Sequence, residues 1–223
     1  MIIKTLNLTR RYYLGASVIE AVKDVNLEIE DAGFVTIVGP SGSGKTTLLN
    51  LIGLIDYPTS GKVFFKNRDM SLLSSKERRN IRFQNIGFIF QTFNLVPTLT
   101  ALENVELPMA FAKMSQEAQR EDAVNLLEAV GLANRLQHKP KEMSLGEMQR
   151  VAIARALANQ PSLILADEPT GELDSKTGSE IIRLLLDLSR KQKTAIVVAT
   201  HDEKVIDVAN KKYRIRDGVI NFS

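Results

Sequence analysis

Short apolar runs alternate with segments of helical periodicity along most of this chain of 223 residues. The apolar runs are rich in β-branched residues and predict buried strands at residues 34–38, 86–90, 163–166 and 194–199. Helices are predicted at 47–52 and from about 177 to 190, where apolar residues recur at helical spacing. Apolar strands that alternate with helices predict an α/β fold, in which a mostly parallel sheet is covered on both faces.

The N-terminal part shows a different pattern. Residues 2–8 and roughly 18–29 alternate between apolar and polar and predict half-exposed antiparallel strands, and residues 62–66 predict a further strand. The segment 10–15 between the first two predicts a turn with two adjacent aromatic residues, Tyr12 and Tyr13. Composition alone favours Tyr12 as core filling over a flat surface on which a purine base stacks.

The period changes again between about 92 and 160. Ser115 is predicted to cap a helix that Gly131 stops, and Ser144 is predicted to begin another. This mostly helical block interrupts two strand-rich parts. We therefore expect a single domain over 1–223, with a core and its β subdomain at 1–91 and 160–223 and an inserted α-helical subdomain at 92–159.

A basic helix is predicted ahead of the strand at 86–90. Ser74 with Glu77 three residues later forms a capping box, which starts a helix through about Arg82. Its arginines are interpreted as a solvated face; they are Arg78, Arg79 and Arg82.

Composition narrows the function classes. The net charge of +3, from 29 basic and 26 acidic residues, is too small to indicate a nucleic-acid partner. The chain has no cysteine, which suits a reducing compartment. No apolar run approaches the length that crosses a bilayer, and the N-terminus does not resemble a signal peptide. We therefore expect a chain that is soluble by itself, so that any membrane role requires a partner chain.

The strand at 34–38 and the helix at 47–52 flank a phosphate-binding loop, the pattern G-x-x-x-x-G-K-[ST]. Its residues are Gly39, Pro40, Ser41, Gly42, Ser43, Gly44, Lys45 and Thr46. Glycines let backbone N–H groups converge on phosphate oxygens at a helix N-terminus. Lys45 is expected to reach the β- and γ-phosphates, and the Thr46 hydroxyl to bind Mg²⁺. The chain is therefore predicted to have a P-loop NTPase core, and a chance glycine turn is the weaker interpretation.

Polar residues follow three further strands, where an α/β sheet binds its ligands. Gln91 follows the strand at 86–90, Asp167 and Glu168 follow 163–166, and His201 comes after 194–199. Asp167 is expected to hold Mg²⁺ opposite Thr46, and Glu168 to polarise the attacking water. The structural alternative is that both acids cap the next segment.

The ordered motifs resemble the ATP-binding subunit of an ATP-binding-cassette (ABC) transporter over essentially the whole chain. They are the phosphate loop, Gln91, Ser144 to Glu147, Leu163 to Glu168, Leu173-Asp174 and His201. The sequence is most similar to the stand-alone ATPases of lipoprotein-releasing, macrolide-exporter-type and cell-division permeases. That likeness is carried by residues 91–97, 102–105, 169–171 and 173–178.

The resemblance implies a role for each matching residue. Tyr12 would stack on adenine, which reverses the preference from composition, and Thr47 would join the phosphate loop. Gln91 would contact Mg²⁺ and the attacking water and sense the permease. Glu168 would be the catalytic base and His201 the γ-phosphate contact.

The resemblance also implies partners. Two ATPase chains would close head to tail, so that each ATP lies between one phosphate loop and the other chain's signature segment, with Asp174 in the dimer loop. The expected ligands are ATP and Mg²⁺, and the expected partner is an integral-membrane permease. The chain would then be cytoplasmic and peripheral on the inner face of the cell membrane.

The signature segment departs from the family pattern. The usual Leu-Ser-Gly-Gly-Gln is here Met143-Ser144-Leu145-Gly146-Glu147, which retains Ser144 and Gly146 as expected γ-phosphate contacts with Glu147 beside them. Leu145 replaces a glycine, so it is expected to crowd the partner's nucleotide or to change the backbone angle. Ser144 and Glu147 also fit a capping box, which is compatible with anion binding. Glu172 is a smaller departure from which the sequence predicts no consequence.

Three alternatives stay open beside an ATPase that drives a permease. One is a regulatory switch on a membrane complex with little turnover, marked by Leu145. Another is a soluble ABC ATPase in repair or translation, which is disfavoured because this chain has neither a long coiled-coil insertion nor a second cassette. A kinase is disfavoured by the signature segment and by the Asp167-Glu168 pair.

Overall fold

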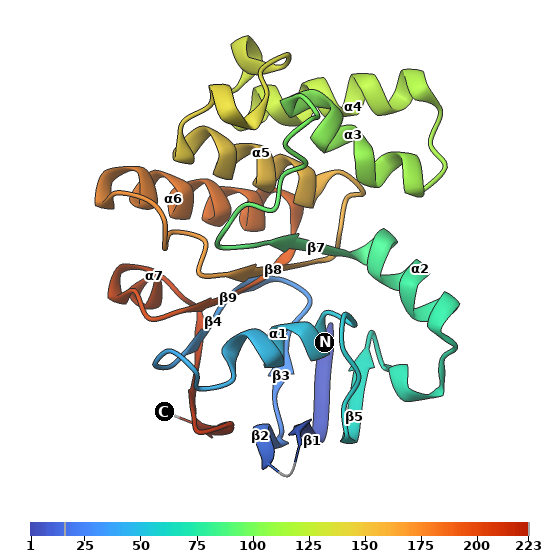
Figure 1. Cartoon of the computed structure of the whole chain (residues 1–223), viewed down its shortest axis with the longest axis vertical. Helices are drawn as coiled ribbons and strands as arrows, with labels where there is room; N and C mark the ends of the chain where they lie inside the picture. The colour runs from blue at the N-terminus through green and yellow to red at the C-terminus, as the bar shows by residue number, and fades with distance from the viewer. Residues whose placement is uncertain (16, 223) are drawn as a thin grey trace.

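The computed structural model describes residues 1–15 and 17–222. A six-stranded sheet in the order β11-β10-β4-β9-β8-β7 crosses the middle of the molecule (Figure 1). Its strands are β4 (Gly33–Val38), β7 (Ile86–Ile89), β8 (Leu163–Asp167), β9 (Ala195–Thr200), β10 (Lys211–Arg216) and β11 (Val219–Phe222). All neighbours pair in parallel except β11, which returns antiparallel to β10. The α/β fold with a mostly parallel sheet is confirmed.

Successive residues of the central strands feed two separate hydrophobic cores. Val35 and Val197 pack in the core that holds α1 (Lys45–Ile52). Phe34 and Ile196, one position earlier in each strand, pack in the second core. Side chains alternate between the two faces of a strand, so a strand buried on both faces is apolar at every position. Figure 1 shows α1 on one side of the sheet, with α5 and α6 on the other.

Helices form a layer over the second core (Figure 1). They are α3 (Ala101–Phe111), α4 (Gln116–Ala129), α5 (Leu145–Leu157) and α6 (Ser175–Gln192). Ser115 caps α4 and Ser144 caps α5, as predicted. The sequence pattern did not predict α3 as a separate helix, although Thr100 and Glu103 form its capping box.

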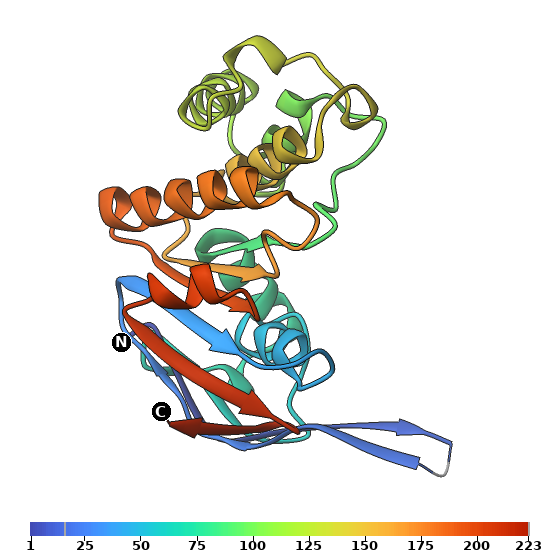
Figure 2. The same cartoon turned by 90° about the vertical axis from the view of Figure 1, so that its left-hand side faces the viewer.

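The second sheet is antiparallel, in the order β2-β1-β5-β6, with β3 paired to β1. Its strands are β1 (Ile3–Leu14), β2 (Ser17–Val25), β3 (Glu28–Ile29), β5 (Ser60–Phe65) and β6 (Arg68–Asp69). The predicted turn at 10–15 is wrong for residues 10–14, which continue β1. Cross-strand pairs extend the ladder there: Arg11 lies opposite Glu20 with an ion pair, and Tyr13 lies opposite Val18. The resulting hairpin projects from the body (Figure 2).

A C-terminal hairpin was not predicted. Tyr213 and Ile215 of β10 are buried, and Asp217 and Gly218 both have positive φ at the turn into β11. Asp-Gly between alternating apolar residues is a strong hairpin signal, so the sequence contained the information. A short helix, α7 (Glu203–Asp207), connects β9 to this hairpin.

The basic helix α2 (Ser75–Asn85) starts with the predicted capping box of Ser74 and Glu77. The interpretation of its arginines as a solvated face is wrong for Arg78, which is only 3% exposed, and for the half-buried Arg82. Arg78 donates to the carbonyls of Asp56 and Met70 and stacks 4.2 Å from the centroid of the Tyr57 ring.

Arg82 donates to the carbonyl of Leu54. Burial lowers the pKa of both guanidinium groups. The turn that follows α1 has carbonyls that need donors, and two arginines of α2 supply them. The short helix η1 (Met70–Leu72), which precedes α2, contributes a further acceptor for Arg78, the carbonyl of Met70.

We expect Arg78→Ala to lower the free energy of unfolding by about 2–3 kcal/mol, because it leaves buried carbonyls without a donor. Arg79 is the matched control, since it is the adjacent residue of the same helix and is exposed. Arg79→Ala should change stability by no more than about 0.5 kcal/mol. Urea denaturation of both variants measures the difference, and equal effects would contradict the assignment of Arg78 as a buried donor.

Candidate functional site

The carboxyl ends of β4, β9 and β8 bring charged side chains together, as the strand-end rule predicted. Glu168 follows β8, and its Oε1 lies 3.0 Å from Nδ1 of His201, which follows β9. The same oxygen lies 3.3 Å from Nζ of Lys45, which begins α1 after β4. One carboxylate therefore joins the phosphate loop to the histidine.

The phosphate loop has the backbone that its glycines predict. Gly42 and Gly44 have φ of +77° and +104°, and a Cβ on Gly44 would lie 2.2 Å from the carbonyl oxygen of Ala21. Gly44 is the N-cap of α1 and makes no side-chain cap within the described chain, so backbone N–H groups are left for an anion. Pro40, Ser41 and Thr47 belong to the same loop and first helical turn.

Two segments that the sequence analysis did not connect to the loop support it from behind. A Cβ on Gly39 would lie 2.3 Å from the carbonyl oxygen of Ile215, and Gly218 N–H donates to the carbonyl of Ser43. The C-terminal hairpin and β2 thus hold the loop in place. Lys45 is only 7% exposed and donates to the carbonyls of Gly39 and Pro40 at 2.7 and 3.1 Å.

Thr46 and Asp167 form an oxygen pair that fits a hard cation. Thr46 Oγ1 donates to Asp167 Oδ2 at 2.7 Å, while Asp167 Oδ1 is buried and has no hydrogen-bond partner among the described residues. Burial raises the pKa of Asp167, and the hydrogen bond from Thr46 opposes this shift. A buried carboxylate oxygen beside a hydroxyl suits Mg²⁺, which takes one or two protein oxygens together with substrate phosphates.

Glu168 occupies an uncommon backbone conformation. Its φ is +46°, in the left-handed region, and its N–H donates to the carbonyl of Ala199 at 2.9 Å. Strain of this kind in a non-glycine residue gathers at functional sites. The alternative that the two acids cap the next helix is wrong, because Asp174 caps α6.

Gln91 lies beyond β7 and is turned toward the loop after β8. Its Nε2 donates to Glu172 Oε1 at 3.0 Å. The structure therefore gives a partner to Glu172, which the sequence left without a consequence. No sequence pattern could have shown this contact, because it depends on the reach of two side chains between separate loops.

Tyr12 lies on β1 in the projecting hairpin and is half-buried. Its hydroxyl donates to Asp56 Oδ2 at 2.9 Å, and the guanidinium of Arg10 lies 4.6 Å from the ring centroid. The contact between Gly44 and Ala21 of β2 places this hairpin beside the phosphate loop. Arg10 therefore covers one face of the half-buried Tyr12 ring, whereas Tyr13 is 68% exposed.

The signature segment lies apart from this cluster. Ser144 and Glu147 form the capping box of α5, and Arg135 Nε donates to Glu147 at 2.8 Å. Arg135 and the Ser144 backbone lower the pKa of Glu147. Leu145 is 48% exposed. Because α5 packs on the face of the sheet opposite to α1, the structure does not bring Ser144, Gly146 or Glu147 to the phosphate loop of their own chain.

Thr177 connects the signature segment to the start of α6. A Cβ on Gly146 would lie 2.6 Å from Thr177 Cγ2, so a larger residue there would have to displace the Thr177 side chain. Asp174 accepts from the N–H groups of Lys176 and Thr177 and from the Thr177 hydroxyl. These hydrogen bonds, led by those of Thr177, hold the pKa of Asp174 below its usual value.

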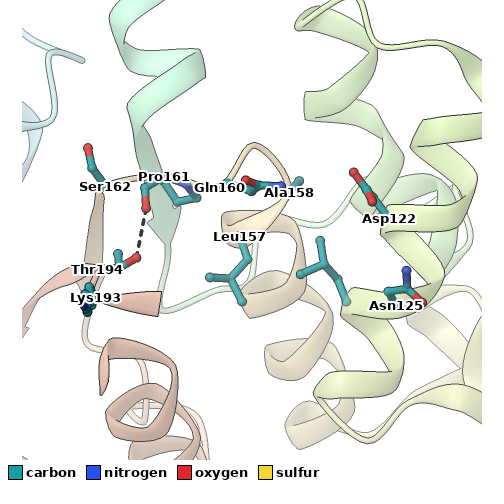
Figure 3. A pocket seen from close by; sticks show the side chains of 10 residues that line it. Asp122, Asn125, Leu157, Ala158, Gln160, Pro161, Ser162, Lys193 and Thr194 are labelled. Carbon is teal, nitrogen blue, oxygen red and sulfur yellow. Dashed lines mark hydrogen bonds between the residues drawn. The ribbon is translucent and has the colours of Figure 1, made fainter. Parts of the chain in front are cut away.

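A cavity of about 550 Å³ lies at the opposite edge of the sheet (Figure 3). Asp122 and Asn125 of α4 line one side, and Ser162 and Thr194, just before β8 and β9, line the other. In the described part of the chain, its lining includes none of the predicted site residues. The predicted chemistry therefore belongs to the carboxyl edge of the sheet.

The phosphate loop, the oxygen pair of Thr46 and Asp167, and Glu168 at the end of β8 define a P-loop nucleotide-binding site. The family described as "ABC transporter" matches residues 22–171. An uncharacterized ABC transporter ATP-binding protein of Methanocaldococcus jannaschii, MJ0796, is 49% identical and covers 98% of this chain and 94% of its own. The lipoprotein-releasing system ATP-binding protein LolD of Legionella pneumophila is 44% identical over 98% of this chain and 96% of its own.

A solved structure gives the same result. The dimeric, post-hydrolysis ATP-binding cassette MJ0796 bound to ADP and Pi has a TM-score of 0.92 and 47% identity, and the match covers 99% of this chain and 97% of that one. The chain belongs to the ATP-binding subunits of the ABC transporter family. It is an ATPase, and the predicted family is confirmed.

Two neighbouring tyrosines allow a test of the expectation that Tyr12 stacks on adenine. Tyr12→Ala should weaken ATP binding by about 1–3 kcal/mol, because stacking on an aromatic ring contributes that much for each base. Tyr13→Ala should leave the affinity unchanged, since alternate strand residues face opposite sides. Isothermal titration with ATP measures the difference. Tripolyphosphate, which has no base, should bind both variants equally; a Tyr12→Ala variant with normal ATP affinity would contradict the assignment.

Proposed function

We propose that two copies of this chain enclose two Mg-ATP and that their closure drives a separate membrane permease of the lipoprotein-releasing or macrolide-exporting type. One observation supports it most. The phosphate loop and the Ser144 helix end lie on helices that cover opposite faces of one sheet, so a second copy is needed for both to meet one nucleotide. The relative MJ0796 is described as dimeric in two solved structures.

Hydrolysis uses the groups at the strand ends. The loop N–H groups hold the phosphates, and Lys45 turns from the carbonyls of Gly39 and Pro40 toward the γ-phosphate. Thr46 and Asp167 would hold Mg²⁺, which supplies neutralisation of charge on the β- and γ-phosphates. Glu168 accepts the proton of the attacking water.

Nδ1 of His201 holds the Glu168 carboxylate. Its Nε2 would donate to the γ-phosphate while the bond between the γ-phosphorus and the oxygen of the departing ADP breaks. Fixed donors of this kind supply most of the stabilisation in a site that excludes water. Gln91, which follows β7, would bind the metal and the attacking water.

The second copy contributes its α5 N-terminus. Ser144 and the N–H of Gly146 would face the γ-phosphate, where a helix end favours negative charge. Leu145 is exposed on the first turn of α5, so it meets the opposing loop on closure. We expect it to slow closure and turnover relative to a glycine. The same residue favours the second candidate function, a regulatory switch with little turnover, and phosphate release with and without the permease separates the two.

A groove next to Gln91 fits contact with the permease. A cavity of about 240 Å³ lies between α2, β7, α3 and α5 and is lined by apolar and basic residues, among them Ile55, Phe88, Phe90 and Arg155. Arg155 also donates to the carbonyls of Phe93 and Asn94, which follow Gln91. A permease segment seated here would reach the Gln91 loop directly.

None of the helices in the described ranges has the length and apolar character that spanning a membrane demands. In the proposed complex the permease holds the chain on the cytoplasmic face of the membrane.

We expect Glu168→Gln to retain ATP binding while hydrolysis falls by about 100-fold or more, because the base is lost. The same variant should form a stable dimer when ATP is added, as measured by size-exclusion chromatography with light scattering. Adding Lys45→Ala to Glu168→Gln is the control, and this double variant should stay monomeric. A Glu168→Gln chain that remains single at saturating ATP would refute the dimer, and near-normal turnover would refute the base assignment.

Two equally exposed apolar residues test the groove. Ile55 is 43% exposed and lines it, whereas Val219 is 41% exposed on β11. Ile55→Lys should abolish stimulation of ATP hydrolysis by the membrane protein encoded beside this chain, because a desolvated charge would oppose docking. Val219→Lys should preserve stimulation. Phosphate release in reconstituted vesicles measures both, and both variants should retain the unstimulated rate; equal stimulation would place the docking surface elsewhere.

A further inference from the structure

The contact between Gln91 and Glu172 lies at the edge of the proposed catalytic site. Gln91 follows β7, and Glu172 belongs to the loop between β8 and α6. Gln91 Nε2 donates to Glu172 Oε1 at 3.0 Å. Hydrogen bonds to an ionised acceptor are roughly twice as strong as neutral ones, so this contact can set the conformation of an exposed side chain.

The turn between Glu168 and Glu172 also shapes the position of Gln91. A Cβ on Gly171 would lie 3.2 Å from Gln91 Nε2 and 3.4 Å from its Cδ. It would also lie 3.3 Å from the carbonyl oxygen of Glu168. The carboxamide of Gln91 therefore lies over a glycine in the turn that begins at the proposed base. Gly171 N–H donates to that carbonyl at 3.0 Å and closes the turn.

The carboxylate of Glu172 fixes the orientation of the Gln91 carboxamide, because only the NH₂ group can donate to it. An ionised carboxylate only accepts hydrogen bonds, so it can hold the NH₂ group of a glutamine but not its carbonyl oxygen. With Nε2 held at Glu172, Oε1 lies on the opposite side of the carboxamide. Mg²⁺ takes oxygen ligands, and a water proton needs an acceptor, so Oε1 is the useful atom in both roles.

We propose that Glu172 is a positioning residue: it fixes the amide of Gln91 so that Oε1 is presented to the metal and the attacking water. This inference rests on the proposed function only for the role of Gln91. In this role Glu172 acts through its hydrogen bond to Gln91. A chain with a residue of another type at position 172 would leave the amide free to rotate.

The test measures metal binding rather than turnover. Mn²⁺ is titrated into ATP-loaded protein in the Glu168→Gln background and followed by electron paramagnetic resonance. Glu172→Ala should weaken Mn²⁺ binding about tenfold, the lower end for residues that orient a metal ligand. Glu172→Gln, which can accept but also donate, should give an intermediate loss. Glu121→Ala on α4, also exposed, is the matched control and should bind Mn²⁺ normally.

A double-mutant cycle distinguishes positioning of Gln91 by Glu172 from a direct effect of the Glu172 charge on the metal. If Glu172 acts through Gln91, then Glu172→Ala should have no further effect in a Gln91→Ala chain. An equal loss in that background would overturn the proposal, because the carboxylate would then act by its charge alone. Unchanged Mn²⁺ affinity in Glu172→Ala would overturn it as well.

ATP affinity in the presence of a chelator reports folding and should be the same in all variants. Light scattering of the same samples reports dimer formation independently. A failure of the proposed dimer therefore leaves the Mn²⁺ result interpretable.

Discussion

The structure depends on the burial of the central parallel strands on both faces. Val35 and Phe34 of β4 serve different cores, and the same holds for Val197 and Ile196 of β9. Because parallel strands end at one edge, every residue that follows them is delivered to the same place. The strand order alone is therefore enough to bring the site residues together. Shifting one strand along its neighbours would move the polar residue at its end away from this edge, so the packing that holds the sheet also holds the site.

That edge gathers groups that are costly to bury. Lys45 is buried and Asp167 is partly buried, and Asp167 Oδ1 and Ser43 Oγ have no hydrogen-bond partner in the described ranges. Glu168 adds a left-handed backbone. An unpaired buried polar atom costs about 1–3 kcal/mol, so the rest of the fold must offset this local instability. Such features persist where an arrangement is selected for chemistry rather than for stability.

The sequence predicted those parts that follow from periodicity and strand order. The central strands β4, β7, β8 and β9, the phosphate loop and the meeting of Lys45, Glu168 and His201 belong to this class. Sequence patterns did not predict features that depend on a tertiary contact. The burial of Arg78, for example, depends on carbonyls in a turn distant in the sequence. The strand at residues 10–14 was also predicted wrongly, as a turn. Aromatic and charged residues can extend a hairpin when they have cross-strand partners, and the sequence does not show which residues pair. Pairs between loops, such as Gln91 with Glu172, leave no periodic signal.

The segment from Glu168 to Asp174 explains how these parts could act together. It begins at the proposed base, supports Gln91 through Gly171 and Glu172, and ends at the cap of α6. Thr177, bound to that cap, packs against Gly146 in the signature segment. A displacement of Gln91 by a permease, or of α5 by a second copy, would therefore reach Glu168 through one short, hydrogen-bonded stretch of chain. Coupling of this kind requires contiguous contacts, and the segment supplies them: Glu172 contacts Gln91, and the carbonyl of Pro169 accepts a hydrogen bond from Gln149 of α5.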